Sequence, residues 1–286
     1  MDYTKENIAK DLFEIASEQR LEILFRLWEK KSAVSAIAKE LGASVPEVFR
    51  NFERLVKAGL IEKEVGGDYH LTLYGTTVLA QIPSLTILSK YKDYFKNHEY
   101  GNIPTKFIQR IGSLSSGKHI KGMVKVLEMW KDIHQNAEKY IYNILTEIPY
   151  SPDIIETVAA KAKESINIRS VFSDKVIVPN ARKEAYEKLQ FKKFVEKGIL
   201  ERRMQNDVQI VVLLNEKEAS IFFPKHGEAD MSEMLYSSEP AFHEWCYDYF
   251  QHCWANSVPF QERKLVPNEW VNLKNLPIKL KRIVFY

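Results

Sequence analysis

The sequence has no apolar run that approaches the roughly 20 residues of a membrane-spanning helix. Its start, MDYTKENIAKDLFEI, has two acidic residues among the first six and lacks the apolar core of a signal peptide. Only 2 cysteines occur among the 286 residues, which fits a reducing compartment. These absences predict a cytoplasmic protein without a membrane partner.

A large excess of one charge is also missing. The net charge of +3 is too small to predict nucleic-acid binding by itself. Residues 1–80 hold 11 Lys and Arg against 13 Asp and Glu, a balance of −2. A DNA-binding surface in this part of the chain therefore needs basic residues that cluster locally while the acids lie elsewhere. The content of 45% hydrophobic and 28% charged residues is that of a globular protein, and the length suffices for two domains.

The segment from residue 32 to 73 has the pattern of two short helices followed by a hairpin. Its spacing predicts helices over 34–41 and 46–58 and strands over 60–65 and 69–73. Gly42 lies in the turn between the helices, and Gly59 is a usual signal for the end of a helix. This layout is that of a winged helix-turn-helix domain, which places its second helix in a DNA major groove.

The second helix of this motif has an apolar and a polar side. Val48, Phe52 and Leu55 share one face and are the expected core residues. Phe49, at the border, is also expected to be core, and contact with a thymine methyl group is the alternative. Arginine can pair with guanine and asparagine with adenine. The residues expected to contact DNA are Ser44, Glu47, Arg50, Asn51, Arg54, Lys39 and Lys57.

The wing is expected to contribute little to DNA binding. Its turn, Gly66-Gly67-Asp68, has no basic residue, and the carboxylate of Asp68 would repel phosphate. His70, next to the turn, is expected to have a structural role.

Helical segments flank the motif on both sides. Residues 5–16 and 19–29 have apolar side chains at helical spacing, which predicts that both helices pack behind the motif and form its core; these side chains are Ile8, Leu12, Ile15, Leu21, Leu24, Phe25 and Trp28. The stretch 17–24 resembles the entry segment of ArsR-like winged-helix regulators. Residues 74–88, interrupted at Pro83, and 91–98 predict a long trailing helix. Such a helix is commonly a dimerisation element, and DNA sites of this kind are usually two-fold, so a homodimer is expected.

A domain boundary is expected where Gly, Asn and Pro cluster in residues 99–104. The predicted domains are 1–98, a DNA-binding domain with its dimerisation helix, and 99–259, an effector domain. In the second domain, strand-like and helix-like segments alternate, which predicts an α/β domain with a central sheet flanked by helices. The basic tail, residues 260–286, is expected to pack as an edge strand.

The second domain resembles the effector domain of archaeal regulators of the methanogenesis (filamentation) regulator type. The stretches that carry the resemblance are 107–114, 137–142, 212–219 and 242–246. The resemblance implies a phospholipase D-like topology for residues 104–259. Together with the winged helix, it covers most of the chain.

The residues for phospholipase D chemistry are absent from the sequence. That chemistry needs His-x-Lys-x4-Asp, and in the single match to its start, His119-Ile120-Lys121, Val126 occupies the position of the acid. The segment 112–118 has the spacing of a phosphate-binding loop, but His119 stands where Ser or Thr is needed. We therefore expect no enzymatic activity and no cofactor.

The two cysteines, Cys246 and Cys253, lie near His243 in a segment rich in aromatic residues. Positions seven apart on a helix are about 10.5 Å apart, too far for a disulfide. His243 and Cys246 lack visible partners for a complete metal site. We expect both cysteines to be core residues, with an intermolecular redox role as the alternative.

A small-molecule effector site is expected where strands of the second domain end, as in other open α/β sheets. The candidate ligand-binding residues are Glu147, Tyr150, Arg169, Ser173 and Asp174. Ordinary turn chemistry is the alternative explanation of these residues. The sequence as a whole predicts a dimeric transcription regulator that binds double-stranded DNA and senses a ligand. The alternative is a winged-helix module that binds protein and does not read DNA.

Overall fold

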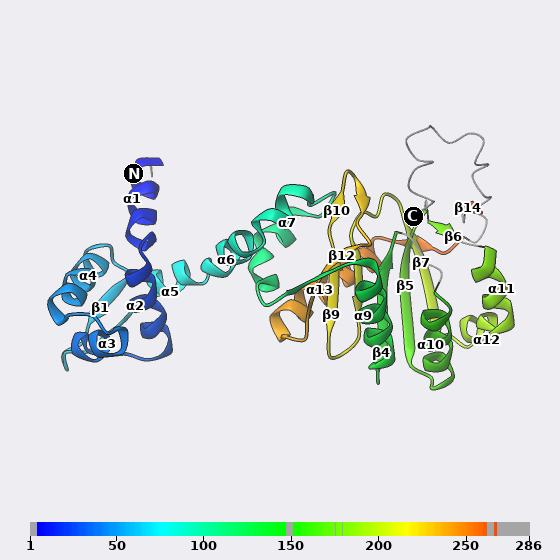
Figure 1. Cartoon of the computed structure of the whole chain (residues 1–286), viewed down its shortest axis with the longest axis horizontal. Helices are drawn as coiled ribbons and strands as arrows, with labels where there is room; N and C mark the ends of the chain where they lie inside the picture. The colour runs from blue at the N-terminus through cyan, green and yellow to red at the C-terminus, as the bar shows by residue number, and fades with distance from the viewer. Residues whose placement is uncertain (1–4, 147–150, 175, 179, 262–265, 268–286) are drawn as a thin grey trace. The chain divides into compact units, whose positions relative to one another are not determined.

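The computed structural model describes residues 5–146, 151–174, 176–178, 180–261 and 266–267 (Figure 1). The chain forms two compact units, Met1–Leu85 and Thr86–Tyr286. The sequence had suggested a boundary at 98/99. Contacts place the division earlier because Ile87 and Tyr94 are buried in the core of the second unit. No helix within the described residues is both long and apolar enough to cross a membrane.

The first unit is a helix-turn-helix domain with a small hairpin, as predicted. Its elements are α1 (Lys5–Ile15), α2 (Glu18–Glu29), α3 (Val34–Leu41), α4 (Val45–Lys57), β1 (Ile61–Lys63), β2 (Tyr69–Leu71) and α5 (Leu73–Leu79). The antiparallel strands pair Ile61 with Leu71, and Ser32 forms a bridge to Tyr69. The hairpin is thereby tied to the segment between α2 and α3.

Local sequence explains the helix-turn-helix. Gly42 ends α3 in the left-handed region, at φ 61°, which a residue without a side chain adopts readily. Ser44 precedes α4 in an extended conformation, and Pro46 lies in the first turn of the helix, where its missing N–H costs no hydrogen bond. Val48, Phe52 and Leu55 are fully buried, as expected from their spacing.

The two leading helices contribute less to the core than predicted. Ile8 and Leu12 in α1 and Phe25 and Trp28 in α2 are exposed, so their assignment to the core was wrong. Only Ile15, at the end of α1, joins the core from that helix. The buried residues of α2 are Arg20, Ile23, Leu24 and Leu27. The residues of α2 that face the core therefore lie about one position earlier in the sequence than the predicted residues.

The predicted long trailing helix is instead three short helices, α5, α6 (Ile82–Lys90) and α7 (Lys92–Asn97). Pro83 lies in the first turn of α6, where proline is tolerated, and so begins a helix and does not bend one. Within the second unit, Tyr94 of α7 stacks on His98 and packs near Phe223. The helical character predicted over 74–88 and 91–98 is thus present, with one more break, before Ile82, than the sequence indicated. A dimerisation role for this region stays a prediction.

The second unit contains an eight-stranded mixed sheet of order β13-β7-β5-β4-β8-β9-β12-β3. Its strands are β3 (Lys118–Lys121), β4 (Tyr140–Leu145), β5 (Asn167–Ser173), β7 (Leu200–Gln205), β8 (Val211–Leu214), β9 (Ala219–Phe222), β12 (Glu233–Ser237) and β13 (Val258–Pro259). The strands β4, β5 and β7 are parallel, and the other pairs are antiparallel.

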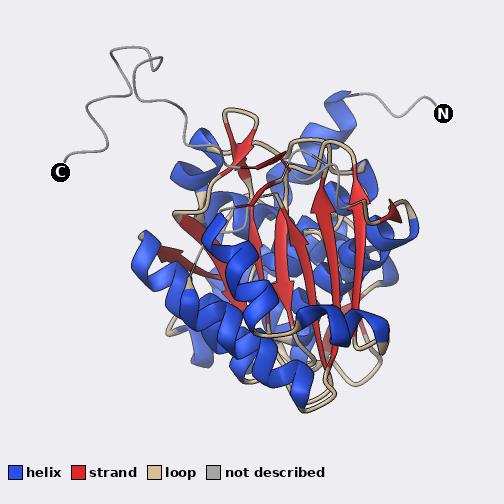
Figure 2. Cartoon of the chain, turned by 90° about the vertical axis from the view of Figure 1, so that its right-hand side faces the viewer, coloured by secondary structure: helices blue, strands red, loops and turns tan. Residues whose placement is uncertain are grey.

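Helices cover both faces of this sheet (Figure 2). On one face, α13 (Pro240–Ala255) packs against β4, β8 and β9. The opposite face carries α9 (Met123–Gln135), α10 (Pro152–Lys163) and α12 (Phe191–Glu196). The predicted central sheet flanked by helices is thus confirmed. The remaining elements are α8 (Thr105–Gln109), a 3-10 helix (Ile111–Leu114), α11 (Asn180–Lys188), β6 (Ile177–Val178), β10 (Pro224–Lys225), β11 (Glu228–Ala229) and β14 (Val266–Pro267).

Several details of the second unit differ from the sequence prediction. The expected helix over 181–197 is broken into α11 and α12 at Gln190, which adopts a left-handed conformation with φ 58°. Strands β3 and β12 were not predicted, because KHIK and EMLYS have too few apolar residues to mark them. The tail prediction falls largely on residues 268–286, which lie outside the described residues. Within the tail, Val266–Pro267 pairs with β6 and does not extend the eight-stranded sheet.

Candidate nucleic-acid interface

Four of the predicted DNA-contacting residues are exposed, although Lys57 lies close enough to Glu14 to help lower the pKa of its carboxyl. The side chains of Lys39, Ser44, Arg50 and Lys57 form no hydrogen bond or ion pair with any residue that the structure describes. Arg50 and Lys57 project from α4 on the side opposite the buried Val48, Phe52 and Leu55. Unpaired cations on a helix of this kind are available to phosphates and base edges.

Arg54 is held by an acid of the same domain. Its guanidinium donates to the Glu14 carboxylate, from Nε at 3.0 Å and from Nη2 at 2.8 Å. These hydrogen bonds to Arg54 are the main reason that the pKa of Glu14 lies below its ordinary value. The end of α1 is fixed in turn by the buried Arg20, which donates to the carbonyl oxygens of Phe13 at 2.9 Å and Glu14 at 2.5 Å.

Asn51 and Glu47 are linked to the start of α2 through Gln19. The Asn51 amide donates to the Gln19 side-chain oxygen, and the Gln19 amide donates to a Glu47 carboxylate oxygen at 3.0 Å. This chain of hydrogen bonds orients three polar side chains along one edge of α4. It also occupies donors and acceptors that the sequence assigns to base edges. Sequence reasoning missed Glu14 and Gln19, since nothing in their spacing shows that α1 and α2 reach α4.

An exposed apolar stripe runs along the other edge of α4. Val45, Phe49 and Val56 have 49%, 44% and 42% of their surfaces exposed. The prediction that Phe49 belongs to the core is therefore wrong. Phe49 follows Val48 by one residue, a step of about 100° around the helix, which takes it to the border of the buried face. The sequence signal for the stripe was the i, i+4 spacing of Val45 and Phe49.

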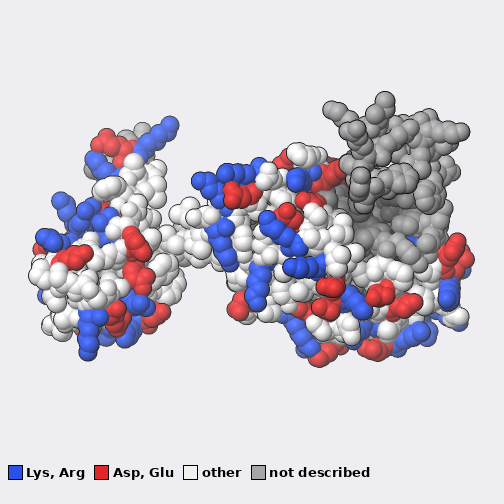
Figure 3. All heavy atoms as spheres, viewed as in Figure 1, with Lys and Arg blue, Asp and Glu red and all other residues white. Residues whose placement is uncertain are grey.

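The wing has its charges paired within the domain. Glu64 accepts from Lys31 at 2.8 Å, and His70 lies 2.9 Å from Glu62 and 3.5 Å from Glu64. Val65 at the tip is fully exposed. These contacts give His70 a structural role in the hairpin. Over the face visible in Figure 3, basic and acidic side chains lie interspersed on the first unit.

The proposed ligand-binding residues of the second unit are not brought together in one site. Arg169 donates to Glu201 at 2.8 Å and lies over the rings of Tyr142 and Trp254. Ser173 is buried at the end of β5, four residues and about 13 Å along the strand from Arg169. The backbone N–H of Asp174 donates to Gln205 at 3.1 Å. Glu147 and Tyr150 lie outside the described residues.

The histidine and cysteine side chains that could serve in catalysis have structural roles. His119 lies on the edge strand β3, and its Nε2 is 2.7 Å from Glu233 on β12. Cys246 and Cys253 are free and buried, as expected, and burial raises the pKa of the Cys253 thiol to about 12. Within the described residues, no three His, Cys, Asp or Glu side chains gather closely enough to hold a metal ion.

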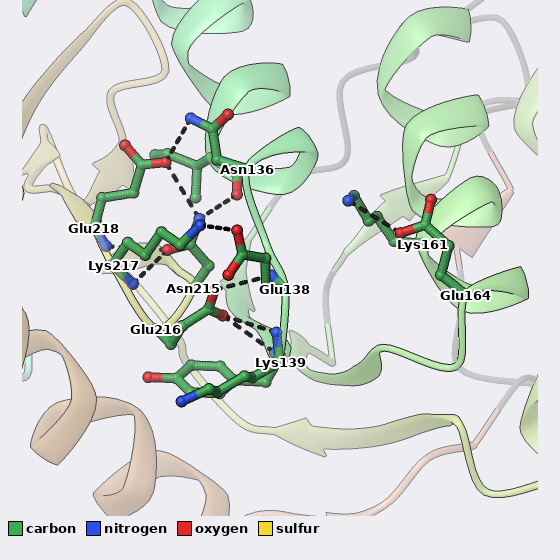
Figure 4. Close-up of polar contacts among 11 residues, drawn as sticks. Asn136, Glu138, Lys139, Lys161, Glu164, Asn215, Glu216, Lys217 and Glu218 are labelled. Atoms are coloured by element: carbon green, nitrogen blue, oxygen red, sulfur yellow. Dashed lines mark hydrogen bonds and ion pairs between the residues drawn. The ribbon is translucent and has the colours of Figure 1, made fainter.

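A polar cluster in the second unit gathers around the loop between β8 and β9 (Figure 4). The Glu216 carboxylate accepts from the backbone N–H groups of Glu138 at 2.9 Å, Lys139 at 3.1 Å and Tyr140 at 3.3 Å. Burial acts to raise the pKa of Glu216, but these donors more than offset it and lower the pKa. Asn215 is fully buried and donates to Ile133 at 2.6 Å. The cluster fixes the loop against the start of β4.

Comparisons with known proteins identify the first unit. Residues 17–63 match the family model of the ArsR family of bacterial regulatory proteins. A search of curated protein sequences found no match. The archaeal chromatin protein TrmBL2, described with a novel mode of DNA binding, is similar at 10% identity over 90% of this chain and 100% of its own, with a TM-score of 0.38.

Enzyme structures show a similarly distant likeness. The phospholipase D family member Nuc from Salmonella typhimurium is 14% identical over 51% of this chain and 99% of its own, with a TM-score of 0.38. NucT from Helicobacter pylori is 10% identical over 50% of this chain and 98% of its own, with a TM-score of 0.37. Likenesses this distant assign neither activity nor ligand. The assignment rests on the family model, by which residues 17–63 are an ArsR-family helix-turn-helix domain within a longer chain.

Proposed function

We propose that this protein is a sequence-specific, DNA-binding transcription regulator that acts in the cytoplasm as a homodimer. The observation that carries the proposal is the exposure of Arg50, without an acidic partner among the described residues, on the second helix of an ArsR-family helix-turn-helix, where Lys57 is also exposed. Such cations provide the phosphate and base contacts that a recognition helix needs. Ser44 and Lys39 extend this set toward the turn between α3 and α4.

The dimer and the effector follow as further parts of the proposal. DNA sites of helix-turn-helix proteins are commonly two-fold, so two copies of α4 would meet two half-sites. We assign ligand sensing and further dimer contacts to the second unit, with a small molecule bound where β5 ends at Ser173 and Asp174. Ligand binding would change DNA affinity by favouring one spacing of the two recognition helices.

The test is DNA affinity of the full chain as a function of salt. A duplex enriched from a random library serves as probe, and Arg50→Ala and Lys57→Ala are compared with the parent. We expect Arg50→Ala to cost about 1–3 kcal/mol of binding free energy, and Lys57→Ala to lower the salt slope by about one. The matched control is Lys125→Ala, which removes an exposed lysine from α9 in the second unit and leaves affinity unchanged.

The second candidate function is a protein-binding module. The observation that favours it is the internal pairing of Arg54 and Asn51, together with the balance of −2 in residues 1–80. This function predicts that the chain forms a complex with another protein and that the complex persists at high salt. It also predicts that selection from a random library enriches no DNA duplex. Equal DNA affinity of the parent, Arg50→Ala and Lys57→Ala would refute the assignment of α4 as the recognition helix.

A further inference from the structure

The apolar stripe on α4 leaves a large part of each of its three side chains exposed. Val45 and Phe49 are one helical turn apart in the first two turns of α4, and both expose nearly half of their surface. Val56 continues the same edge near the other end of the helix. Exposing a phenyl ring to water is unfavourable compared with burying it. The rest of this helix face presents polar and charged side chains, so the exposed ring indicates a binding surface.

The position of the stripe points to the DNA groove. In helix-turn-helix proteins the N-terminal residues of the second helix contact base edges. Val45 and Phe49 lie in this part of α4, beside Ser44 and Arg50, whose side chains have no partner among the described residues. The nearest acid along this edge, Glu53, lies one turn further toward the C-terminal end of the helix.

The polar residues on the opposite edge of α4 are already engaged. Arg54 is paired with Glu14, and Asn51 is hydrogen-bonded to Gln19. Base reading by these two side chains would first require breaking contacts within the domain. Apolar contacts from Val45 and Phe49 require no such exchange. The apolar group that a base presents in the major groove is the 5-methyl of thymine.

We propose, on the basis of the function proposed above, that Phe49 and Val45 read thymine 5-methyl groups in the major groove while Arg50 contacts an adjacent base or phosphate. The protein is then selective for A·T pairs at these positions through burial of methyl groups. Arg50 and Lys57, exposed on the same helix as the stripe, fit a DNA occupant better than an apolar protein surface.

Replacing thymine by deoxyuridine tests the proposal, because it removes only the methyl group. A duplex is first enriched from a random library by the full chain. Each thymine of the enriched site is then replaced singly by deoxyuridine, and affinity is measured for the parent and for Phe49→Ala, Phe49→Leu and Val45→Ala. Val56→Ala, on the same edge but near the C-terminal end of α4, is the matched control.

We expect one or two deoxyuridine positions to weaken binding by the parent about fourfold each, the factor that corresponds to ~0.8 kcal/mol for one buried methyl-sized group. At one of these positions Phe49→Ala should bind thymine and deoxyuridine duplexes equally, whereas Phe49→Leu should keep part of the difference. Circular dichroism verifies that the variants fold, as expected for an exposed residue.

The outcomes separate this proposal from the general function. Selective DNA binding with no deoxyuridine effect in the parent overturns methyl reading and leaves the regulator assignment intact. A deoxyuridine effect that persists unchanged in both Phe49→Ala and Val45→Ala also overturns it. Failure to enrich any duplex refutes DNA binding itself, and with it this proposal.

Discussion

Arg54 in α4 donates two charge-assisted hydrogen bonds to Glu14 in α1, at 3.0 Å from Nε and 2.8 Å from Nη2. The bidentate geometry is the one that arginine also uses toward guanine and phosphate. In the proposed function, Glu14 would compete with DNA for the same donors. The contact would then make α1 part of the recognition surface, although its sequence predicts only a packing helix.

Replacing Glu14 with glutamine should raise DNA affinity. The change removes a negative charge beside α4 and frees Arg54, so we expect a gain of about threefold to tenfold at low salt, the effect of roughly 1 kcal/mol of repulsion. Fluorescence anisotropy with an enriched duplex measures it. The control is Glu6→Gln, which removes an α1 acid whose partner is Lys10. A gain that survives in the double variant Glu14→Gln, Arg54→Ala would show that release of Arg54 is not its cause.

The same contact predicts how stability depends on pH. The pKa of Glu14 is lowered in the folded state, mainly by the hydrogen bonds from Arg54. Its carboxylate therefore stabilises the fold at pH values above the ordinary Glu pKa of about 4.3, and this stabilisation is lost as the pH falls through the lower folded-state pKa. Urea unfolding of the parent and Glu14→Gln should differ by less than about 1 kcal/mol at pH 7. The difference should shrink as the pH falls below the ordinary Glu pKa. A difference that grows on acidification would contradict the sign.

The helix-turn-helix was predictable because its signals are local. Gly42, Pro46 and Gly59 mark where helices begin and end, and Val48 and Phe52 mark the buried side of α4. The errors came from tertiary placement. Phe25 and Trp28 share a helical spacing with the core residues of α2, but the core took the neighbouring face. Periodicity identifies an apolar side chain without showing whether anything covers it.

The sequence could predict which residue types form the candidate interface. It could not predict which of their side chains are free of contacts within the domain. The sequence selects Arg50, Asn51 and Arg54 on equal grounds, yet the structure leaves only Arg50 without a partner among the described residues. The pairing of Arg54 depends on Glu14, 40 residues earlier in the chain. Contacts over such separations depend on how the helices pack against one another. The spacing of residues along a single helix carries no information about that packing.

Asn215→Ala should destabilise the second unit. The Asn215 amide donates to Ile133 at 2.6 Å, and its Oδ1 accepts the backbone N–H groups of Lys217 at 2.7 Å and Glu218 at 3.0 Å. Because the site is fully buried, truncation leaves these groups without partners, at a cost of about 2–3 kcal/mol. Chemical denaturation measures the loss. The control Lys217→Ala removes an exposed ion pair with Glu138 and should change stability far less than Asn215→Ala. Equal effects of the two variants would refute this role of Asn215.

Gly75→Ala should destabilise the first unit more than any exposed substitution nearby. A Cβ at residue 75 would lie 2.0 Å from the backbone oxygen of Leu60, a contact that only movement of α5 away from the hairpin can relieve. That movement would also break the cap in which Thr72 accepts from the Gly75 N–H at 2.9 Å and donates to Gly59 at 2.7 Å. We expect a loss of about 3 kcal/mol, from overpacking together with the lost cap. Thr76→Ala, one residue further and exposed, is the control and should change stability by less than about 0.5 kcal/mol. Thermal unfolding of both variants decides the matter, since a Gly75→Ala variant as stable as the parent would mean that α5 does not need this close approach to Leu60.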